Sequence, residues 1–409
     1  MASSTGRRAA IGLAGALACV PALSAQSSLG EAERWYHARQ WFELRTAVTV
    51  RSPALLRAAV AAAFNDRPQA ERLLRGVVRS DASSDVVNDA YALLSQIYLR
   101  SGEYARFVRN YDEWAAACPT SQALVEEKDG VDKFRGRPDQ VSEPRRASVF
   151  HHEADDFSVP VSINGYRDDF LFDTGAWQSI VTEAEAKKLG LAPGAETHVL
   201  TGASGQTATF RTAVAKEVIV GAMRFRDVSF GVIAPPEGLP RDLEGGIVGM
   251  PILLALGRIR WSTDGAGEVA GATRSRSRTP NLVFDRHRLL VAADVLGRRV
   301  LTTLDTGARS TDLNANFAAA FRDVVDRDGR KGTASITGAG GTRTFESVEL
   351  PQVAFTIGRA TVWLRPASVT LQRIGILGGE CCVGNAGHDL LVQTRAFSID
   401  FSTMTLQLE

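Results

Sequence analysis

A short motif occurs twice in the second half of the chain, each time directly after an apolar segment. Asp173-Thr-Gly-Ala follows Phe170-Leu-Phe172, and Asp305-Thr-Gly-Ala follows Leu301-Thr-Thr-Leu304. One Asp-Thr-Gly can arise by chance in a chain of 409 residues, but two with the same strand-like segment before them indicate a duplicated unit. A chain with such a duplication is expected to fold into two similar lobes.

The segments around the two motifs repeat as well. Asn164-Gly165 precedes the first motif, and Leu296-Gly297 precedes the second at the same distance. Downstream, Thr201-Gly-Ala-Ser-Gly recurs as Thr337-Gly-Ala-Gly-Gly. Short alternating segments separated by Gly-rich turns are typical of β-strands and hairpins. We therefore predict an all-β region of two lobes, lobe 1 at residues 157–263 and lobe 2 at residues 282–409.

Two carboxylates held on facing loops have a specific chemistry. Close together, Asp173 and Asp305 cannot both ionise readily, so they share a proton and titrate as a coupled pair. The ionised carboxylate can take a proton from a water held between the two, while the protonated one donates to a substrate carbonyl oxygen. This pair can hydrolyse an amide by general acid–base catalysis without a covalent intermediate.

Residues 157–409 resemble the retropepsin-like and pepsin-like aspartic proteases, whose dyad follows the same shared-proton logic. Viral members carry one such motif per subunit and act as homodimers, whereas pepsin carries two motifs in one chain, as here. The Ala after each Gly is the retroviral pattern. The resemblance implies an all-β bilobal aspartic-protease fold with a monomeric active site, a peptide or protein substrate and no cofactor.

The same resemblance implies roles for individual residues. Asp173 and Asp305 are implied to be the catalytic dyad. Threonine hydroxyls would lock the two loops, and glycines would let their backbones approach closely. These supporting residues are Thr174, Gly175, Thr306 and Gly307. Gly-rich turns would form two flaps that close over an extended substrate. The flap candidates are Gly202, Ser204, Gly205, Gly338, Gly340 and Gly341.

Each lobe is also expected to contain a closing element of two apolar residues and a glycine. In lobe 1 this element is Ile247-Val248-Gly249. Lobe 2 offers two candidates. Ile376-Leu377-Gly378 matches by composition, and Gly387-His388-Asp389-Leu390-Leu391 matches better by its distance to the last strands. The sequence leaves both open.

The region before the lobes has a different character. Residues 26–135 are rich in Ala, Leu, Arg and Glu, with apolar residues at helical spacing. A shift by one period of the tetratricopeptide helical hairpin, about 34 residues, places Phe64 on Tyr98 and Leu73 on Phe107. The region therefore resembles a short tetratricopeptide-like array, with a plain antiparallel helical bundle as the alternative. We predict an N-terminal all-α helical-hairpin region, followed by a linker at 136–156.

The role of this helical region stays open between two possibilities. A helical array can bind a protein partner or orient a substrate. A prosegment would instead cover the cleft until it is removed. A second linker is predicted at residues 264–281, between the lobes, where Gly, Ser and Arg are frequent.

The N-terminal segment, residues 1–25, is predicted to be a secretory signal peptide. Arg7 and Arg8 form a basic segment, Ala9 to Leu23 is apolar, and Ser24-Ala25-Gln26 offers a cleavage point. No later stretch reaches the ~18 uninterrupted apolar residues of a membrane helix. The expected product is exported to the periplasm or secreted, without an integral membrane segment. Lipid attachment at Cys19 is the less favoured variant.

Composition excludes other classes of function. The formal net charge of +1 gives no basic footprint for nucleic acid. The histidines show no ligand spacing with cysteines or acidic residues, so no metal site is expected. The cysteines beyond the signal are Cys118, Cys381 and Cys382, too few for a disulfide scaffold. The adjacent pair is predicted to be two reduced thiols, because a ring between neighbours is strained.

The sequence thus favours an exported aspartic endopeptidase that activates a water between Asp173 and Asp305. The alternative, from another class, is a catalytically weak or silent protease-like protein. Such a protein would bind peptides or serve as a scaffold through its helical domain.

Overall fold

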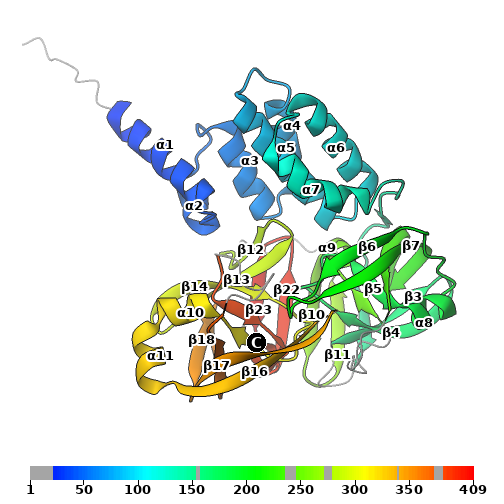
Figure 1. Cartoon of the computed structure of the whole chain (residues 1–409), viewed down its shortest axis with the longest axis vertical. Coiled ribbons are helices and arrows are strands. Elements are labelled where there is room, and N and C mark those ends of the chain that lie inside the picture. The colour runs from blue at the N-terminus through cyan, green and yellow to red at the C-terminus, as the bar shows by residue number, and fades with distance from the viewer. Residues whose placement is uncertain (1–21, 153–156, 235–245, 271–278, 339, 373–380) are drawn as a thin grey trace, which may run out of the picture.

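The computed structural model contains a helical N-terminal region and two β lobes (Figure 1). It describes residues 22–152, 157–234, 246–270, 279–338, 340–372 and 381–409. This order of an all-α region followed by a two-lobed β region confirms the predicted fold class. In these residues no helix is both long and apolar enough to cross a membrane. Most of the predicted signal peptide, with Cys19, lies outside the described residues, and its cleavage point falls within the first described helix.

Successive helices joined by short turns make up the helical region. Helix α4 begins after Asp66, whose Oδ1 accepts a hydrogen bond from the backbone N–H of Gln69 at 3.3 Å, as an N-cap does. A shift by the tetratricopeptide period brings the range of α3 and α4 onto that of α5 and α6. The helices are α1 (Ala22–His37), α2 (Trp41–Ala47), α3 (Ala54–Ala63), α4 (Arg67–Val77), α5 (Ser84–Arg100), α6 (Tyr104–Ala117) and α7 (Gln122–Asp132). The repeat therefore corresponds to two consecutive helical pairs, while membership of the tetratricopeptide family stays a prediction.

Lobe 1 is built on an eight-stranded sheet of order β1-β8-β5-β9-β4-β3-β7-β6. Alternate residues of β3 are buried, as its sequence pattern predicts. The strands are β1 (Val141–Ser142), β3 (Ser158–Ile163), β4 (Tyr166–Phe172), β5 (Ser179–Thr182), β6 (Thr197–Thr201), β7 (Thr207–Val220), β8 (Met223–Ile233) and β9 (Ile247–Val248). Two short helices accompany them, α8 (Glu183–Lys188) and α9 (Met250–Leu256).

Lobe 2 repeats this plan in a ten-stranded sheet. Its path is β16-β17-β20-β15-β21-β14-β13-β18-β19, with β12 paired to β13. The strands are β12 (Leu282–Asp285), β13 (Arg288–Val295), β14 (Arg298–Leu304), β15 (Asp312–Leu313), β16 (Arg330–Gly338), β17 (Gly341–Leu350), β18 (Val353–Ile357), β19 (Ala360–Leu364), β20 (Ala367–Thr370) and β21 (Gly384–Ala386). The helices are α10 (Ala315–Ala320), α11 (Arg322–Asp328) and α12 (His388–Leu391). The motif-bearing strands β4 and β14 each pair in parallel with a short strand, β9 and β21 respectively.

A third sheet joins the two lobes. It has five strands in the order β2-β11-β10-β22-β23. They are β2 (Ser148–His151), β10 (Arg258–Ser262), β11 (Ala266–Ala270), β22 (Ala396–Asp400) and β23 (Thr405–Leu408). The segments 136–156 and 264–281, predicted as linkers, thus contain strands. These strands were not predicted because their segments are polar and rich in Gly. In β11, for example, only Gly267 and Val269 are buried, so the sequence lacks a clear apolar alternation.

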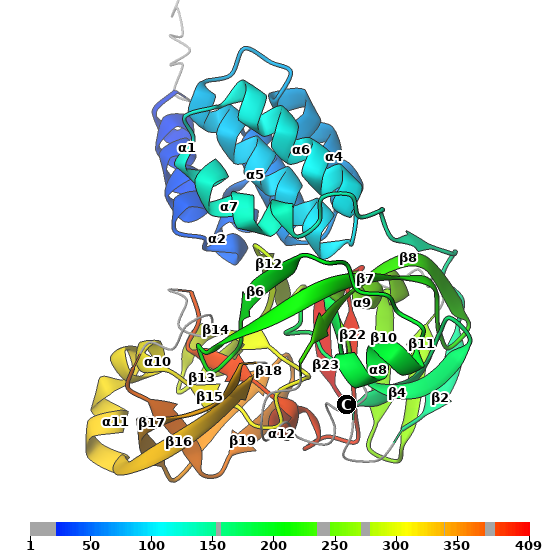
Figure 2. The ribbon, with the colours of Figure 1, turned by 45° about the vertical axis from the view of Figure 1, so that its right-hand side comes forward.

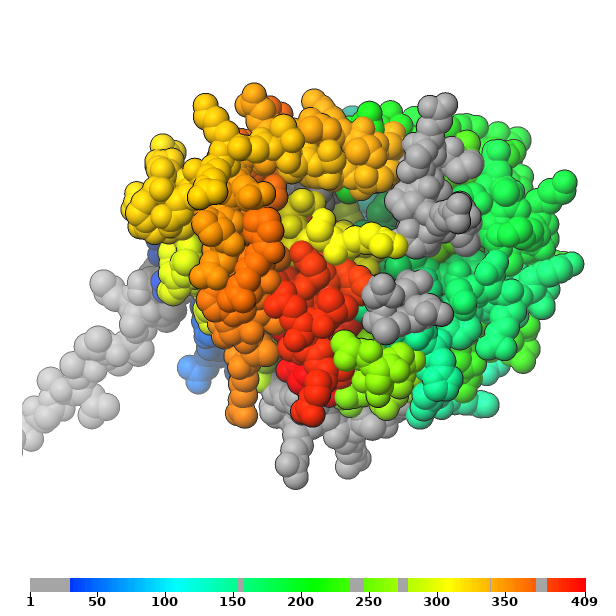
Figure 3. All heavy atoms as spheres, turned by 90° about the horizontal axis from the view of Figure 1, so that it is seen from below, coloured from blue at the N-terminus to red at the C-terminus, as the bar shows by residue number. Residues whose placement is uncertain are grey.

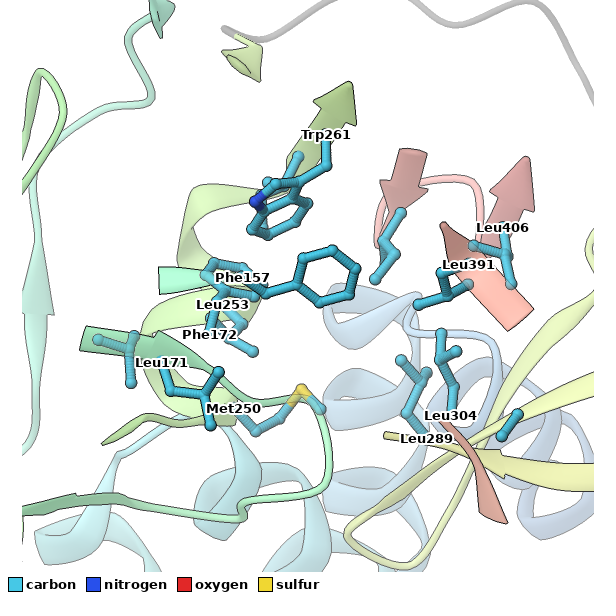
Figure 4. Packing of buried hydrophobic residues seen from close by; sticks show 14 of the residues in the cluster. Phe157, Leu171, Phe172, Met250, Leu253, Trp261, Leu289, Leu304, Leu391 and Leu406 are labelled. Atoms are coloured by element: carbon cyan, nitrogen blue, oxygen red, sulfur yellow. The ribbon is translucent and has the colours of Figure 1, made fainter. Parts of the chain in front are cut away.

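The core of the β region runs from one lobe into the other without a break. Phe157 lies between residues of the two lobes, and Trp261 lies next to it (Figure 4). The rings of Trp261 and Phe397 stack with centroids 5.4 Å apart, and the ring of Phe157 lies 5.0 Å from that of Phe397. The two lobes therefore fold around one shared apolar interior.

The helical region packs on one side of the β region, next to β12 (Figures 1 and 2). Its apolar cluster includes Val283, Leu290 and Ala292 of lobe 2. The guanidinium of Arg100, 2% exposed, lies over the ring of Phe284 at 4.6 Å. The helical region and lobe 2 thus share a core.

The two adjacent cysteines form a disulfide, which corrects the prediction of two reduced thiols. The carbonyl oxygen of Cys382 accepts hydrogen bonds from the side-chain amides of Asn314 and Asn316, at 3.0 and 2.9 Å. These contacts hold the backbone of the pair in place. Ring strain in an isolated dipeptide is therefore a poor guide here, because the surrounding structure fixes the local conformation.

Candidate active site

Each Asp-Thr-Gly loop begins where a buried strand ends. The backbone N–H of Asp173 donates to the carbonyl of Val248 at 3.1 Å, and that of Asp305 donates to the carbonyl of Ala386 at 2.9 Å. These bonds extend the parallel pairs β4–β9 and β14–β21 by one step. The two carboxylates are thus presented from equivalent places in the two lobes.

Reciprocal threonine hydrogen bonds connect the two loops. The backbone N–H of Thr174 donates to Oγ1 of Thr306, and the backbone N–H of Thr306 donates to Oγ1 of Thr174, both at 3.0 Å. The hydroxyl of Thr174 donates to the carbonyl of Leu304 at 2.8 Å, and that of Thr306 donates to the carbonyl of Phe172 at 2.5 Å. Both threonines are 2% exposed, so each hydroxyl satisfies backbone groups of the opposite lobe that water does not reach.

Glycine is required next to both threonines because the opposite carboxyl lies too near for a side chain. A methyl group on Gly175 would lie 2.6 Å from Cγ of Asp305. One on Gly307 would lie 2.4 Å from Cγ of Asp173. The structure therefore brings together the six loop residues that the sequence singled out.

The two carboxyl groups have closely similar hydrogen-bond partners. Oδ1 of Asp173 accepts from the backbone N–H groups of Gly175 and Ala176, at 2.7 and 3.1 Å. Oδ1 of Asp305 accepts from those of Gly307 and Ala308, at 3.0 and 3.1 Å. Burial raises the pKa of Asp173 well above its ordinary value, and the neighbouring Asp305 raises it further, against the lowering effect of the two N–H groups. One proton held between the two carboxyls is the expected state.

The closing element of lobe 2 is the one that contains Gly387. In lobe 1, the backbone N–H of Gly249 donates to Oγ of Ser179 at 3.1 Å, and Gly249 caps helix α9. In lobe 2, the N–H of Gly387 donates to Oγ1 of Thr311 at 2.9 Å, and Gly387 caps helix α12. The other candidate, Ile376-Leu377-Gly378, lies outside the described residues.

A further polar residue at this site was missed by sequence reasoning. The side-chain amide nitrogen of Asn385 donates to Oδ2 of Asp305 at 2.8 Å. Asn385 lies on β21, directly before Ala386 and Gly387. It pairs with Thr303 of β14. In lobe 1 the equivalent pair is Ile247 of β9 and Leu171 of β4, so Ile247 is the counterpart of Asn385. The sequence feature that could have indicated Asn385 is the polar first residue of Asn-Ala-Gly, at a place where lobe 1 has Ile-Val-Gly.

The predicted flap residues lie at the tips of two hairpins, β6–β7 and β16–β17, and the two tips meet. A methyl group on Gly338 would lie 2.6 Å from the backbone nitrogen of Ala203, and one on Gly340 would lie 2.5 Å from the carbonyl oxygen of Gln206. In the first tip Gly205 has a positive φ of 77°, and its N–H donates to the carbonyl of Gly202 at 3.0 Å. The remaining candidates, Ser204 and Gly341, belong to the same tips, with Ser204 fully buried.

The molecule is hollowed between the two lobes when it is seen from the side away from the helices (Figure 3). Strands β16 and β17 border this hollow. Across the described ranges, no group of three or more His, Cys, Asp or Glu side chains is arranged to hold a metal ion. The arrangement suits acid–base chemistry by two carboxyls.

Comparison with known proteins gives a family match for lobe 1. The aspartyl protease family model matches residues 159–252, which contain the first Asp-Thr-Gly-Ala motif, the first flap and the first closing element. Among solved structures, a retropepsin-like aspartic protease from Rickettsia conorii is similar to this chain, with 21% identity and a TM-score of 0.23. That similarity covers 30% of this chain and 98% of the Rickettsia chain. No curated protein matches the chain. Lobe 1 is therefore similar to aspartyl proteases in sequence.

Proposed function

We propose that this protein is an aspartic endopeptidase that hydrolyses peptide bonds with a water activated between Asp173 and Asp305. The observation that carries the proposal is the meeting of the two loops, locked by Thr174 and Thr306, with one carboxyl from each lobe. The family match over lobe 1 supports the same reaction class.

The reaction needs one ionised and one protonated carboxyl. The ionised carboxyl takes a proton from water as the water oxygen bonds to the substrate carbonyl carbon. The protonated carboxyl gives its proton to the carbonyl oxygen, so a neutral diol forms. When the carbon–nitrogen bond breaks, one diol proton returns to the second carboxyl, and the first carboxyl protonates the departing nitrogen. The dyad ends with the single proton it held at the start.

The site is complete within one chain, so we propose that it acts as a monomer. The experiment that tests the activity is cleavage of a peptide library between about pH 3 and pH 8, with and without a pepstatin-like inhibitor. Inhibitor-sensitive cleavage is expected. Failure to cleave any peptide would favour the silent, peptide-binding alternative.

For the helical region we propose a role in binding a protein partner or the protein substrate, after export of the chain. Two consecutive helical pairs, α3–α4 and α5–α6, support an array with a surface for an extended partner. The shared core with lobe 2 argues against a removable prosegment, because removal would expose Val283, Leu290 and Ala292.

A cleavage site for a specific protease, inserted in the exposed segment 143–147, separates the two roles. After cutting and release of the helical piece, the rate on a short peptide should be unchanged if the helices bind a partner. A several-fold gain would show that they cover the site.

A further inference from the structure

The two halves of the site differ at one pair of positions, although their backbones match. In lobe 1, Ile180 of β5 lies opposite Ile247 of β9. In lobe 2, the equivalent cross-strand pair is Asp312 of β15 and Asn385 of β21. An apolar pair on one side of the dyad is thus replaced by a polar pair on the other.

The polar pair acts on one member of the dyad. Asn385 is 3% exposed, and its amide nitrogen donates to Oδ2 of Asp305. Asp305 already accepts two backbone N–H groups through Oδ1. At the position of Asn385, lobe 1 has Ile247, whose side chain has no polar atom to offer Asp173.

A buried amide donor favours the ionised form of the carboxyl that it contacts. The opposite rotamer of Asn385 would place its amide oxygen against Asp305, which is acceptable only when that carboxyl carries a proton. In the observed rotamer the amide oxygen has no hydrogen-bond partner within the described part of the chain. The side chain therefore leaves its own oxygen unsatisfied while it donates to Asp305.

We propose that Asn385 is a positioning residue that keeps Asp305 ionised, so that Asp305 is the base toward water and Asp173 is the acid toward the substrate carbonyl. This assignment rests on the proposed function. In the reaction, Asp305 takes the water proton and later delivers it to the leaving nitrogen. Asp173 protonates the carbonyl oxygen and recovers a proton when the diol collapses.

Burial and the neighbouring carboxyl of Asp305 hold the pKa of Asp173 above its ordinary value. Two further titratable groups near the dyad are Asp312 on β15 and Asp389 on α12. Burial raises the pKa of Asp312 to about 6, and the charges of Asp389 and Asp305 add to this effect. Asp389 is held by the N–H and hydroxyl of Thr311, at 3.0 and 2.5 Å.

The test compares the pH dependence of kcat/KM in the full chain and in two variants at this position. Asn385→Ile copies the residue of lobe 1, and Asn385→Leu is nearly isosteric with asparagine but has no donor. Loss of the donor should move the acid limb of the profile upward by roughly one to two pH units. The matched control, Ile247→Val, should leave the limb in place. Asp312→Asn removes the titration of the carboxyl opposite Asn385, whose pKa is about 6.

A readout without activity accompanies the kinetics. With 13C-labelled aspartate carboxyls, assigned by Asp173→Asn and Asp305→Asn, the resonance of Asp305 should titrate at lower pH than that of Asp173. In Asn385→Ile the difference in pH between the titrations of the two resonances should become smaller. Because this measurement needs no turnover, a chain that cleaves no peptide would refute the proposed function and leave the proton assignment testable.

Two results would overturn the inference. One is an acid limb that stays in place in both Asn385 variants while their thermal stability falls, which shows a purely structural role. The other is a titration in which Asp173 loses its proton first.

Discussion

Phe134 packs edge-on against Trp177, with ring centroids 5.8 Å apart and planes at 84°. Phe134 follows the last helix of the helical region, and Trp177 directly follows the first Asp-Thr-Gly-Ala motif. The helical region therefore contacts the same loop that presents Asp173. A perturbation of the helices can reach the dyad through this aromatic contact.

Phe134→Ala should lower the free energy of unfolding by about 3–5 kcal/mol, because the ring is fully buried and also stacks on Tyr104. Denaturant unfolding measures the loss. Val125→Ala, at a side chain that is 68% exposed, serves as the control and should be close to wild type. A Phe134→Ala protein as stable as that control would show that the two regions do not share a core.

Asp173→Asn and Asp305→Asn should each reduce peptide hydrolysis by about 10²–10⁴-fold or more, because the reaction needs both an acid and a base. Initial rates on one short peptide measure the effect, and circular dichroism checks that the fold is kept. Asp294→Asn removes an exposed carboxylate of lobe 2 and should leave the rate unchanged. Near-normal hydrolysis by either dyad variant would rule out the assignment.

Stability should depend on pH through Asp173. Its folded-state pKa is raised, whereas in the unfolded chain it ionises near ~3.9. As the pH rises above that value, the unfolded state releases the proton while the folded state keeps it, so stability falls until the folded-state pKa is passed. Asp173→Asn removes this titration. Its advantage in stability over wild type should be small near about pH 3 and larger near about pH 7. An advantage that shrinks with rising pH would contradict the raised pKa.

Thr174→Val should destabilise the protein by about 1–3 kcal/mol for each backbone group left unpaired, namely the N–H of Thr306 and the carbonyl of Leu304. Thr174→Ser keeps the hydroxyl and should stay near wild type. Thermal unfolding of the two variants side by side tests this. Equal melting temperatures for the valine and serine variants would mean that the hydroxyl does not hold the lobes together.

The two Asp-Thr-Gly loops could be predicted from the sequence because the pattern that marks them is local. Asp173 and Asp305 each follow a segment with strand-like apolar residues, and a repeated motif can be recognised without knowledge of the partner strand. The alternation of buried and less buried residues in β3 could be predicted for the same reason. Export and the boundaries of the domains stay predictions.

The rest depended on contacts between distant segments. Asn385 was missed because its role comes from lying beside Asp305, 80 residues earlier. The apolar face formed by Val283, Leu290 and Ala292 reads as ordinary strand core, and only the folded chain shows that helices cover it. The disulfide between Cys381 and Cys382 likewise lies among contacts from a distant segment, since the side-chain amides of Asn314 and Asn316 donate to the carbonyl of Cys382.

The five-stranded sheet that joins the lobes places β10 directly beside β22, with Arg258 opposite Asp400 and Ser262 opposite Ala396. Strands that are far apart along the chain thereby become neighbours in one hydrogen-bonded ladder. Two fragments produced separately, one ending after β11 and one beginning before β12, would each lack the partner that completes this ladder. Mixed together, they have the edges and apolar surfaces needed to reassociate into one particle. The covalent link between the lobes then serves to set the stoichiometry and effective concentration of two halves that recognise each other through their backbones.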